Sequence, residues 1–204
     1  MKTACPLIIA VLAAALFSAS PASATELYSG STTLGVNATI DASLEPNTSA
    51  ELTDTAGKPV DTCTTSTVHG AISVAGSATS TAKGEIETLT WGSAGDLCTQ
   101  PLTTTVAKGQ LEVHHIAGTH DGTITGKGTV VDILVFGVHC LYGTEPATDL
   151  GVLLGKTGLT EHATVFINAV IPELEPKKFT CPDTTRWVAS YTVTSLTGLN
   201  VRAS

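Results

Sequence analysis

Hydrophobic and polar residues alternate along most of this chain. The clearest run is LGVNATIDASL, residues 34–44, in which every second residue is apolar. A period of two is that of a β-strand with one buried face. Similar runs are separated by Gly, Pro, Asn and Asp at intervals of about eight to twelve residues, as in antiparallel proteins. The pattern predicts an all-β fold, an antiparallel β-sandwich of Ig-like or jelly-roll-like architecture.

One later run breaks the alternation. In VVDILVFGV, residues 130–138, both the odd and the even positions are apolar apart from Asp132. A strand of this kind is covered on both faces, so we expect it at the centre of a sheet. A buried carboxylate needs a partner, and a position for Asp132 at a strand end or a sheet edge is the simpler explanation.

The composition agrees with strands and turns. The chain of 204 residues is rich in Thr and Gly, and charged residues make up only 14% of it. Such a composition is unlike that of a helical enzyme. No stretch is long or polar enough to be an interdomain linker, so residues 25–204 are predicted to form a single β-sandwich domain.

The first residues predict export. Met1-Lys2 precede the apolar run PLIIAVLAAALF, and SASPASA follows it. A positive start, an apolar segment and an A-x-A site are the parts of a signal peptide. We therefore expect residues 1–24 to be a signal peptide and the mature protein to be secreted or associated with the cell envelope. No later stretch has the roughly 20 apolar residues that a membrane-spanning helix needs.

The charge limits the partners. The net formal charge is −8, and EPKKF, residues 175–179, is the densest basic point. An acidic surface without a basic cluster is a poor match for nucleic acid or anionic membranes. We predict no nucleic-acid partner and no transmembrane segment in the mature chain.

Four cysteines follow the predicted signal peptide: Cys63, Cys98, Cys140 and Cys181. An even number in an exported chain predicts disulfides, and four cysteines allow three pairings. We favour Cys63 with Cys98 and Cys140 with Cys181, because each bond then clips one half of the chain. A zinc site is the alternative, but no C-x-x-C pair is present.

The stretch LEVHHIAGTHDG, residues 111–122, is the richest in candidate chemistry. His114 or His115 could meet His120 around a turn, with Glu112 nearby, as a metal site of two histidines and a carboxylate. Adjacent strand residues point to opposite faces, however, and GTHDG has the residues of a hairpin turn. A strand followed by a turn explains the same residues without an ion, so we predict no metal, no cofactor and no catalytic residue.

Other candidates are fewer. Ser93 lies between glycines in WGSAGDLC, but G-x-S-x-G, the pattern of a nucleophile elbow, is absent. Trp91 and Trp187 would form a sugar-binding platform if exposed and part of the core if buried. In RWVASYTV the large residues Trp187 and Tyr191 fall on one face, which favours the core.

Several phrases together resemble a family of small secreted proteins of soil actinobacteria. They are DTCTTSTVHG, KGEIETLTW, VFGVHCLYGTEPATDLGVLLG, FINAV, WVASYTVTS and LNVRAS. The resemblance spans most of the mature chain and implies a signal peptide, four cysteines and an all-β mature region. It implies no catalytic residue.

These observations favour a non-catalytic exported protein with a structural, adhesive or surface-binding role. Its partner would be a cell-surface polymer, or a second copy paired through strand edges. The alternatives are a carbohydrate-binding module and a metal-dependent hydrolase that uses His114, His115 and His120.

Overall fold

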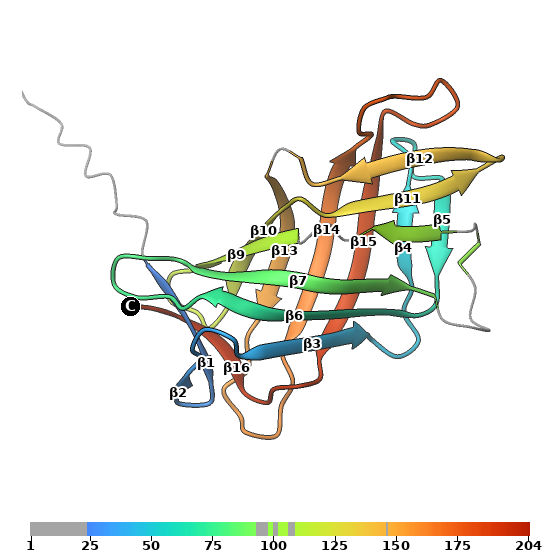
Figure 1. Ribbon diagram of the computed structural model, residues 1–204. Helices are drawn as coiled ribbons and strands as arrows, with labels where there is room; N and C mark the ends of the chain where they lie inside the picture. The colour runs from blue at the N-terminus through green and yellow to red at the C-terminus, as the bar shows by residue number, and fades with distance from the viewer. Residues whose placement is uncertain (1–23, 93–97, 100–101, 106–108, 146) are drawn as a thin grey trace, which may run out of the picture.

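The computed structural model describes residues 24–92, 98–99, 102–105, 109–145 and 147–204. Over these residues the chain forms β-strands and no helix, which confirms the all-β prediction (Figure 1). All but one residue of the predicted signal peptide, 1–24, lies outside the described residues. The strands are β1 (Thr25–Ser29), β2 (Thr32–Thr33), β3 (Thr39–Leu44), β4 (Ala50–Thr53), β5 (Pro59–Cys63), β6 (Ser66–Val74), β7 (Ala82–Trp91), β8 (Leu102–Thr105), β9 (Gly109–His115), β10 (Gly122–Lys127), β11 (Val130–Val135), β12 (Val138–Gly143), β13 (Thr148–Leu154), β14 (Thr164–Pro172), β15 (Thr184–Val193) and β16 (Leu199–Ala203).

Eight of these strands close into a barrel. They pair in the order β14-β13-β10-β9-β7-β6-β3-β15, and β15 pairs back with β14. One edge of β15 pairs with β14 along almost its whole length, while Tyr191–Val193 on the other edge pairs with β3. The rest of that second edge, Arg186–Val188, pairs with β4, which continues to β5.

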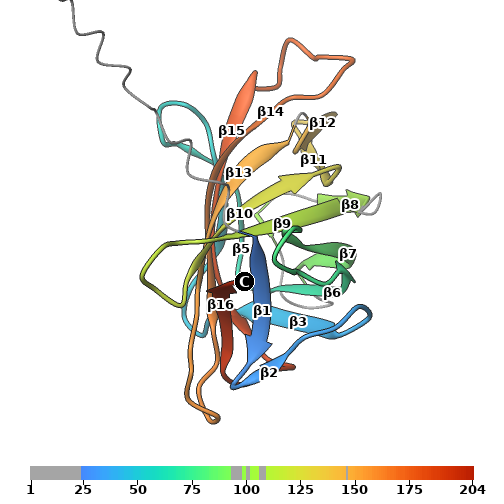
Figure 2. The same ribbon diagram turned by 90° about the vertical axis from the view of Figure 1, so that its left-hand side faces the viewer.

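The closed ring corrects the expectation of a sandwich. Figures 1 and 2 show two layers, with β3, β6 and β7 running across β14 and β15. In a sandwich two such layers face each other as separate sheets, whereas here one continuous hydrogen-bonded sheet forms both. A period of two buries one face of each strand in either architecture. The pairing of β3 with β15, which are far apart in the sequence, distinguishes the closed barrel from a sandwich of two separate sheets.

Two smaller sheets flank the barrel. One has the order β12-β11-β8 and the other β16-β1-β2. Residues of β11 and β12 line a small cavity together with Trp91 and Trp187 of the barrel, so this sheet covers the barrel beside the two tryptophans. The other sheet adjoins β9 and β10: the backbone N–H of His115 donates to Thr25 Oγ1 over 3.0 Å.

Two predicted strands differ from the observed ones. In the run 34–44, the strand begins only at Thr39, because Asn37 takes a left-handed φ of 67° and the chain turns there. The run 130–138 is not one strand, although β11, which forms its first part, is the central strand of its sheet, as expected. It is a hairpin of β11 and β12, with Phe136 and a glycine at positive φ in a two-residue turn. Positive φ at both turn residues is the geometry of a tight hairpin, which the apolar sequence concealed.

Both predicted disulfides are present. Cys63 of β5 is bonded to Cys98, and Cys140 of β12 is bonded to Cys181, in the pairing favoured from the sequence. The second bond fastens the loop between β14 and β15 to the flanking sheet. The buried side chains of the barrel and of both flanking sheets form one hydrophobic cluster.

Candidate functional site

The interior of the barrel contains an apolar cavity of about 100 Å³. Every one of the eight barrel strands contributes to its wall. The pattern of burial shows why, because buried residues alternate with less buried ones throughout β15 and from Phe166 to Ile171 of β14, so that one side of each strand faces inward. The aliphatic part of the wall includes Ile86, Leu111, Ile124, Leu150, Val165 and Ile167.

The wall is almost free of polar atoms. Its only members with a polar side-chain atom are Trp187 and Tyr191. The hydroxyl of Tyr191 lies 2.9 Å from that of Ser66, and burial raises its pKa well above the usual value of a tyrosine. The cavity therefore has no group in its wall that exchanges a proton near neutral pH.

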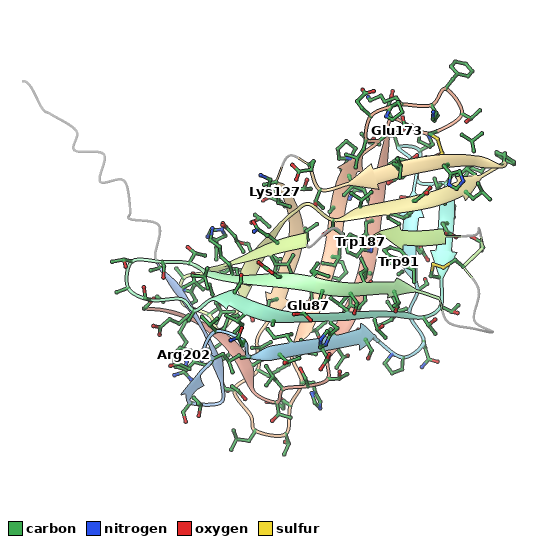
Figure 3. The ribbon with its side chains drawn as sticks, in the orientation of Figure 1. Glu87, Trp91, Lys127, Glu173, Trp187 and Arg202 are labelled. Carbon is green, nitrogen blue, oxygen red and sulfur yellow. A yellow bond between two sulfur atoms is a disulfide. The ribbon has the colours of Figure 1, made fainter. Side chains whose placement is uncertain are left out.

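The two tryptophans lie at the end covered by β11 and β12. Their ring centroids are 5.5 Å apart, and Trp91 and Trp187 are only 8% and 5% exposed (Figure 3). They belong to the core, as the alternation in RWVASYTV suggested for Trp187. This burial removes the observation on which a carbohydrate-binding platform rested.

The histidines of the stretch 111–122 do not meet. His114 points outward from β9 and lies 3.6 Å from Glu112, while Nε2 of His115 is 2.9 Å from the carbonyl oxygen of Thr119. His120 follows in the turn between β9 and β10. The strand and turn predicted from the sequence are observed, and the structure places no metal-type cluster here within the described residues.

Among the residues described, the one group of three potential metal ligands whose donor atoms all lie within 4.8 Å of one another is Asp61 with Cys63 and Cys98. Both of its sulfurs are bonded to each other, so neither is available as a thiolate ligand. The carboxylate of Asp61 instead accepts hydrogen bonds from the backbone N–H of Thr62 and the hydroxyl of Thr99. These hydrogen bonds hold together the two segments that the disulfide joins.

A second cluster lies on the outer face of the barrel and was missed by the sequence analysis. His69 of β6 has Nδ1 2.5 Å from Asp41 and Nε2 3.3 Å from Glu87, on the neighbouring strands β3 and β7. The hydrogen bond with Asp41 raises the pKa of His69; desolvation opposes this rise, and the charges of Asp41 and Glu87 add to it. Because both ring nitrogens face carboxylates, no nucleophile is placed for His69 to activate.

A similar ion pair joins the next two neighbouring strands of the barrel. Lys83 of β7 pairs with Glu112 of β9. The hydrogen bond from Lys83 lowers the pKa of Glu112; desolvation opposes this, and the charges of Lys83 and His114 add to it. These ion pairs link neighbouring strands on the solvent face of the sheet.

The structure also bears on the other residues that the sequence singled out. Asp132 lies within β11, the central strand of its sheet, and not at a strand end or a sheet edge as expected. It pairs with His139 at 2.9 Å, which supplies the partner that its partial burial requires. Ser93 lies outside the described residues. Over the described residues, no helix is long and apolar enough to cross a membrane.

The fold and its cavity define the class as an eight-stranded antiparallel barrel with an apolar interior. Comparison with known proteins finds no matching family model, no matching curated protein and no matching solved structure. Sequence reasoning missed the cavity because the inward residues are the aliphatic ones expected of any core.

Proposed function

We propose that this is an exported, non-catalytic protein that binds one small apolar molecule inside its barrel. The cavity at the centre of the closed sheet carries the proposal. An eight-stranded barrel is just wide enough either to be filled by its own side chains or to hold one small ligand. Here the side chains leave about 100 Å³ unfilled.

The size and chemistry of the cavity support an apolar occupant. A cavity of about 150 Å³ lined by Leu, Ile and Phe stays dry and binds benzene. The present cavity is somewhat smaller and equally apolar, since ten of its twelve wall residues are aliphatic. A molecule of five or six carbon atoms suits it.

The non-catalytic part of the proposal rests on the cavity wall. The described wall contains no His, Cys, Asp, Glu, Lys or Arg, and the pKa of Tyr191 is raised by burial. General acid–base catalysis needs a group whose pKa is near the working pH. The wall is therefore better suited to binding a ligand than to catalysing a reaction.

The export part of the proposal rests on the leader-like residues 1–24 and on the two disulfides, which are most common in oxidising compartments. Its test is the N-terminal sequence of the protein recovered outside the cell. We expect it to begin at Thr25, and protein found only in the cytoplasm with Met1 retained would refute export.

The binding proposal is tested by thermal unfolding of the mature protein with and without benzene. A ligand that binds only the folded state at tenfold excess over Kd stabilises it by about 1.4 kcal/mol. Two variants on β14 provide a matched comparison: Val165→Phe places a ring in the cavity, whereas Val170→Phe lies on the outer face, where Val170 is 50% exposed.

Benzene should raise the unfolding midpoint of the wild type and of Val170→Phe, and should not raise that of Val165→Phe. Absence of any shift in the wild type would refute the proposal, as would an equal shift in both variants.

A further inference from the structure

The aromatic residues of this fold divide by type between core and surface. Both tryptophans and two of the three tyrosines are buried. The phenylalanines of the described residues are not: Phe166 is 39% exposed, Phe136 is 94% exposed and Phe179 is 107% exposed. A phenyl ring stabilises a fold when it is removed from water, and the rings of Phe136 and Phe179 lie almost wholly in water. Packing of the fold therefore does not explain either residue.

The position of Phe136 also costs backbone free energy. Its φ is 50°, in the two-residue turn between β11 and β12. A bulky residue rarely adopts a left-handed conformation, which Gly, Asn and Asp adopt more readily. Conformations of this kind gather at sites that contact ligands or partners. The turn thus presents a ring at its tip where a smaller residue would form the turn more easily.

The two exposed rings belong to neighbouring loops. Figures 1 and 2 show the β11–β12 turn and the loop between β14 and β15 toward the same end of the molecule, in the upper part of both views. The disulfide between Cys140 and Cys181 joins β12 to that loop. Phe136 and Thr180, which follows Phe179, line one groove of about 300 Å³. Because a tight turn and a disulfide hold these loops, little conformational entropy is lost when a partner covers the rings.

The charges beside Phe179 are balanced. Exposed Lys177 and Lys178 precede it, and exposed Glu175 and Asp183 lie in the same loop, with Nζ of Lys177 3.4 Å from Asp183. The chain as a whole has a net charge of −8, so this loop does not share the acidic excess. Such a surface complements a partner that has charges of both signs and no net charge. The headgroups of neutral phospholipids are of this kind.

We propose that this end of the protein docks on the surface of a neutral lipid bilayer, with the rings of Phe136 and Phe179 inserted below the headgroups. Lys177 and Lys178 then lie near the lipid phosphates. Aromatic rings and the apolar stems of lysine are suited to this boundary. A protein partner would need two pockets at a matching spacing, whereas fluid acyl chains receive a protruding ring at any position. The inference goes beyond the proposed function and does not depend on the cavity.

The experiment is flotation of the mature protein with phosphatidylcholine vesicles, without any apolar ligand, over a series of lipid concentrations that gives a partition coefficient. Phe136→Asn removes one ring and supplies a residue that suits the turn, and Phe179→Ser removes the other ring. The matched control is Leu159→Ser. Leu159 is 73% exposed in the loop between β13 and β14, which lies at the opposite end of the molecule (Figure 1).

Each phenylalanine substitution should lower the partition coefficient about tenfold, the factor expected when one phenyl ring is no longer buried. The double variant should lose nearly all binding, and Leu159→Ser should bind like the wild type. A wild type that does not float with the vesicles, or an equal loss in Leu159→Ser, would overturn the inference. Wild-type dimers in size-exclusion chromatography that the double variant does not form, without vesicle binding, would assign the rings to a second copy instead.

A second measurement follows the ring itself and keeps an aromatic side chain in the loop. Phe179→Trp adds an exposed indole, while both native tryptophans are buried. With vesicles of brominated phosphatidylcholine, the emission of the added indole should be quenched, and the wild-type emission should stay unchanged. Unquenched emission from Phe179→Trp that floats with the vesicles would show that the ring stays in water, and would overturn its insertion.

Discussion

Filling the cavity should stabilise the protein while abolishing its ligand site. Ala42 of β3 lies in the cavity wall, between its cross-strand partners Val68 and Val193, which also line it. The substitution Ala42→Val adds two carbon atoms on the inner face. A β-branched side chain suits a strand, and Val is small enough to enter the open volume.

The expected gain follows from the size of the cavity. Burial of two further carbon atoms contributes about 1.6 kcal/mol, at about 0.8 kcal/mol each. Open volume in a core costs about 24 cal/mol per Å³, so a cavity of about 100 Å³ sets a ceiling near 2.4 kcal/mol for removing that cost. We expect a net gain of about 1–2 kcal/mol, which corresponds to a rise of about 3–6 °C in Tm for a chain of this length.

The control is Ala71→Val on the outer side of β6. Ala71 lies next to Ile72, which is buried on the inner side, so its own side chain points out. Both substitutions raise strand propensity alike, and the difference between them isolates the filling of the cavity. Denaturant unfolding and benzene titration of both variants give the two readouts.

We expect Ala42→Val to be more stable than Ala71→Val and to have lost most of its affinity for benzene. A destabilised Ala42→Val would mean that the volume is not free to accept a side chain. A stabilised variant that still binds benzene would place the ligand elsewhere.

Three further outcomes are expected. Phe136→Asn should stabilise the protein by about 1 kcal/mol in denaturant unfolding, because Asn adopts positive φ more readily and the 94% exposed ring has little packing to lose; a loss of stability would show that the ring makes a contact that matters. Asp41→Asn should lower the pKa of His69 in an NMR titration. Since the pKa is raised in the folded protein, the stabilisation from this pair is complete below the unfolded value of about 6.5 and is lost as the pH rises through the folded value. The Tm difference from wild type should therefore shrink as the pH is raised above about 6.5; a constant difference would contradict this. Replacing Cys140 and Cys181 together by Ala should cost about 4 kcal/mol, the chain-entropy value for a loop of 41 residues, and an unchanged denaturation midpoint would refute that estimate.

Much of the local structure could be predicted from the residues alone. Alternation of apolar and polar positions identified most strands, because the period of two is a property of the extended backbone itself. The same periodicity placed His114 and His115 on opposite faces and Trp187 in the core. The cysteine pairing followed from the expectation that each disulfide clips one half of the chain.

The wrong predictions concern features that depend on local backbone conformation or on pairing between strands far apart in the sequence. The turn at Phe136 was read as part of one strand because an aromatic residue at positive φ gives no turn signal. The cluster of Asp41, His69 and Glu87 comes from three strands. Its members are far apart in the sequence, and only the register of those strands brings them together.

The sequence by itself determined that this chain is made of strands with one apolar face, and which side chains lie on that face. Closure into a barrel was decided by the tertiary structure, since it requires β15 to pair with β14 on one edge and β3 on the other. The existence of the cavity also depends on the tertiary structure. Its volume is the difference between the space that eight strands enclose and the space that their inward side chains fill, and neither quantity is local to any stretch of sequence.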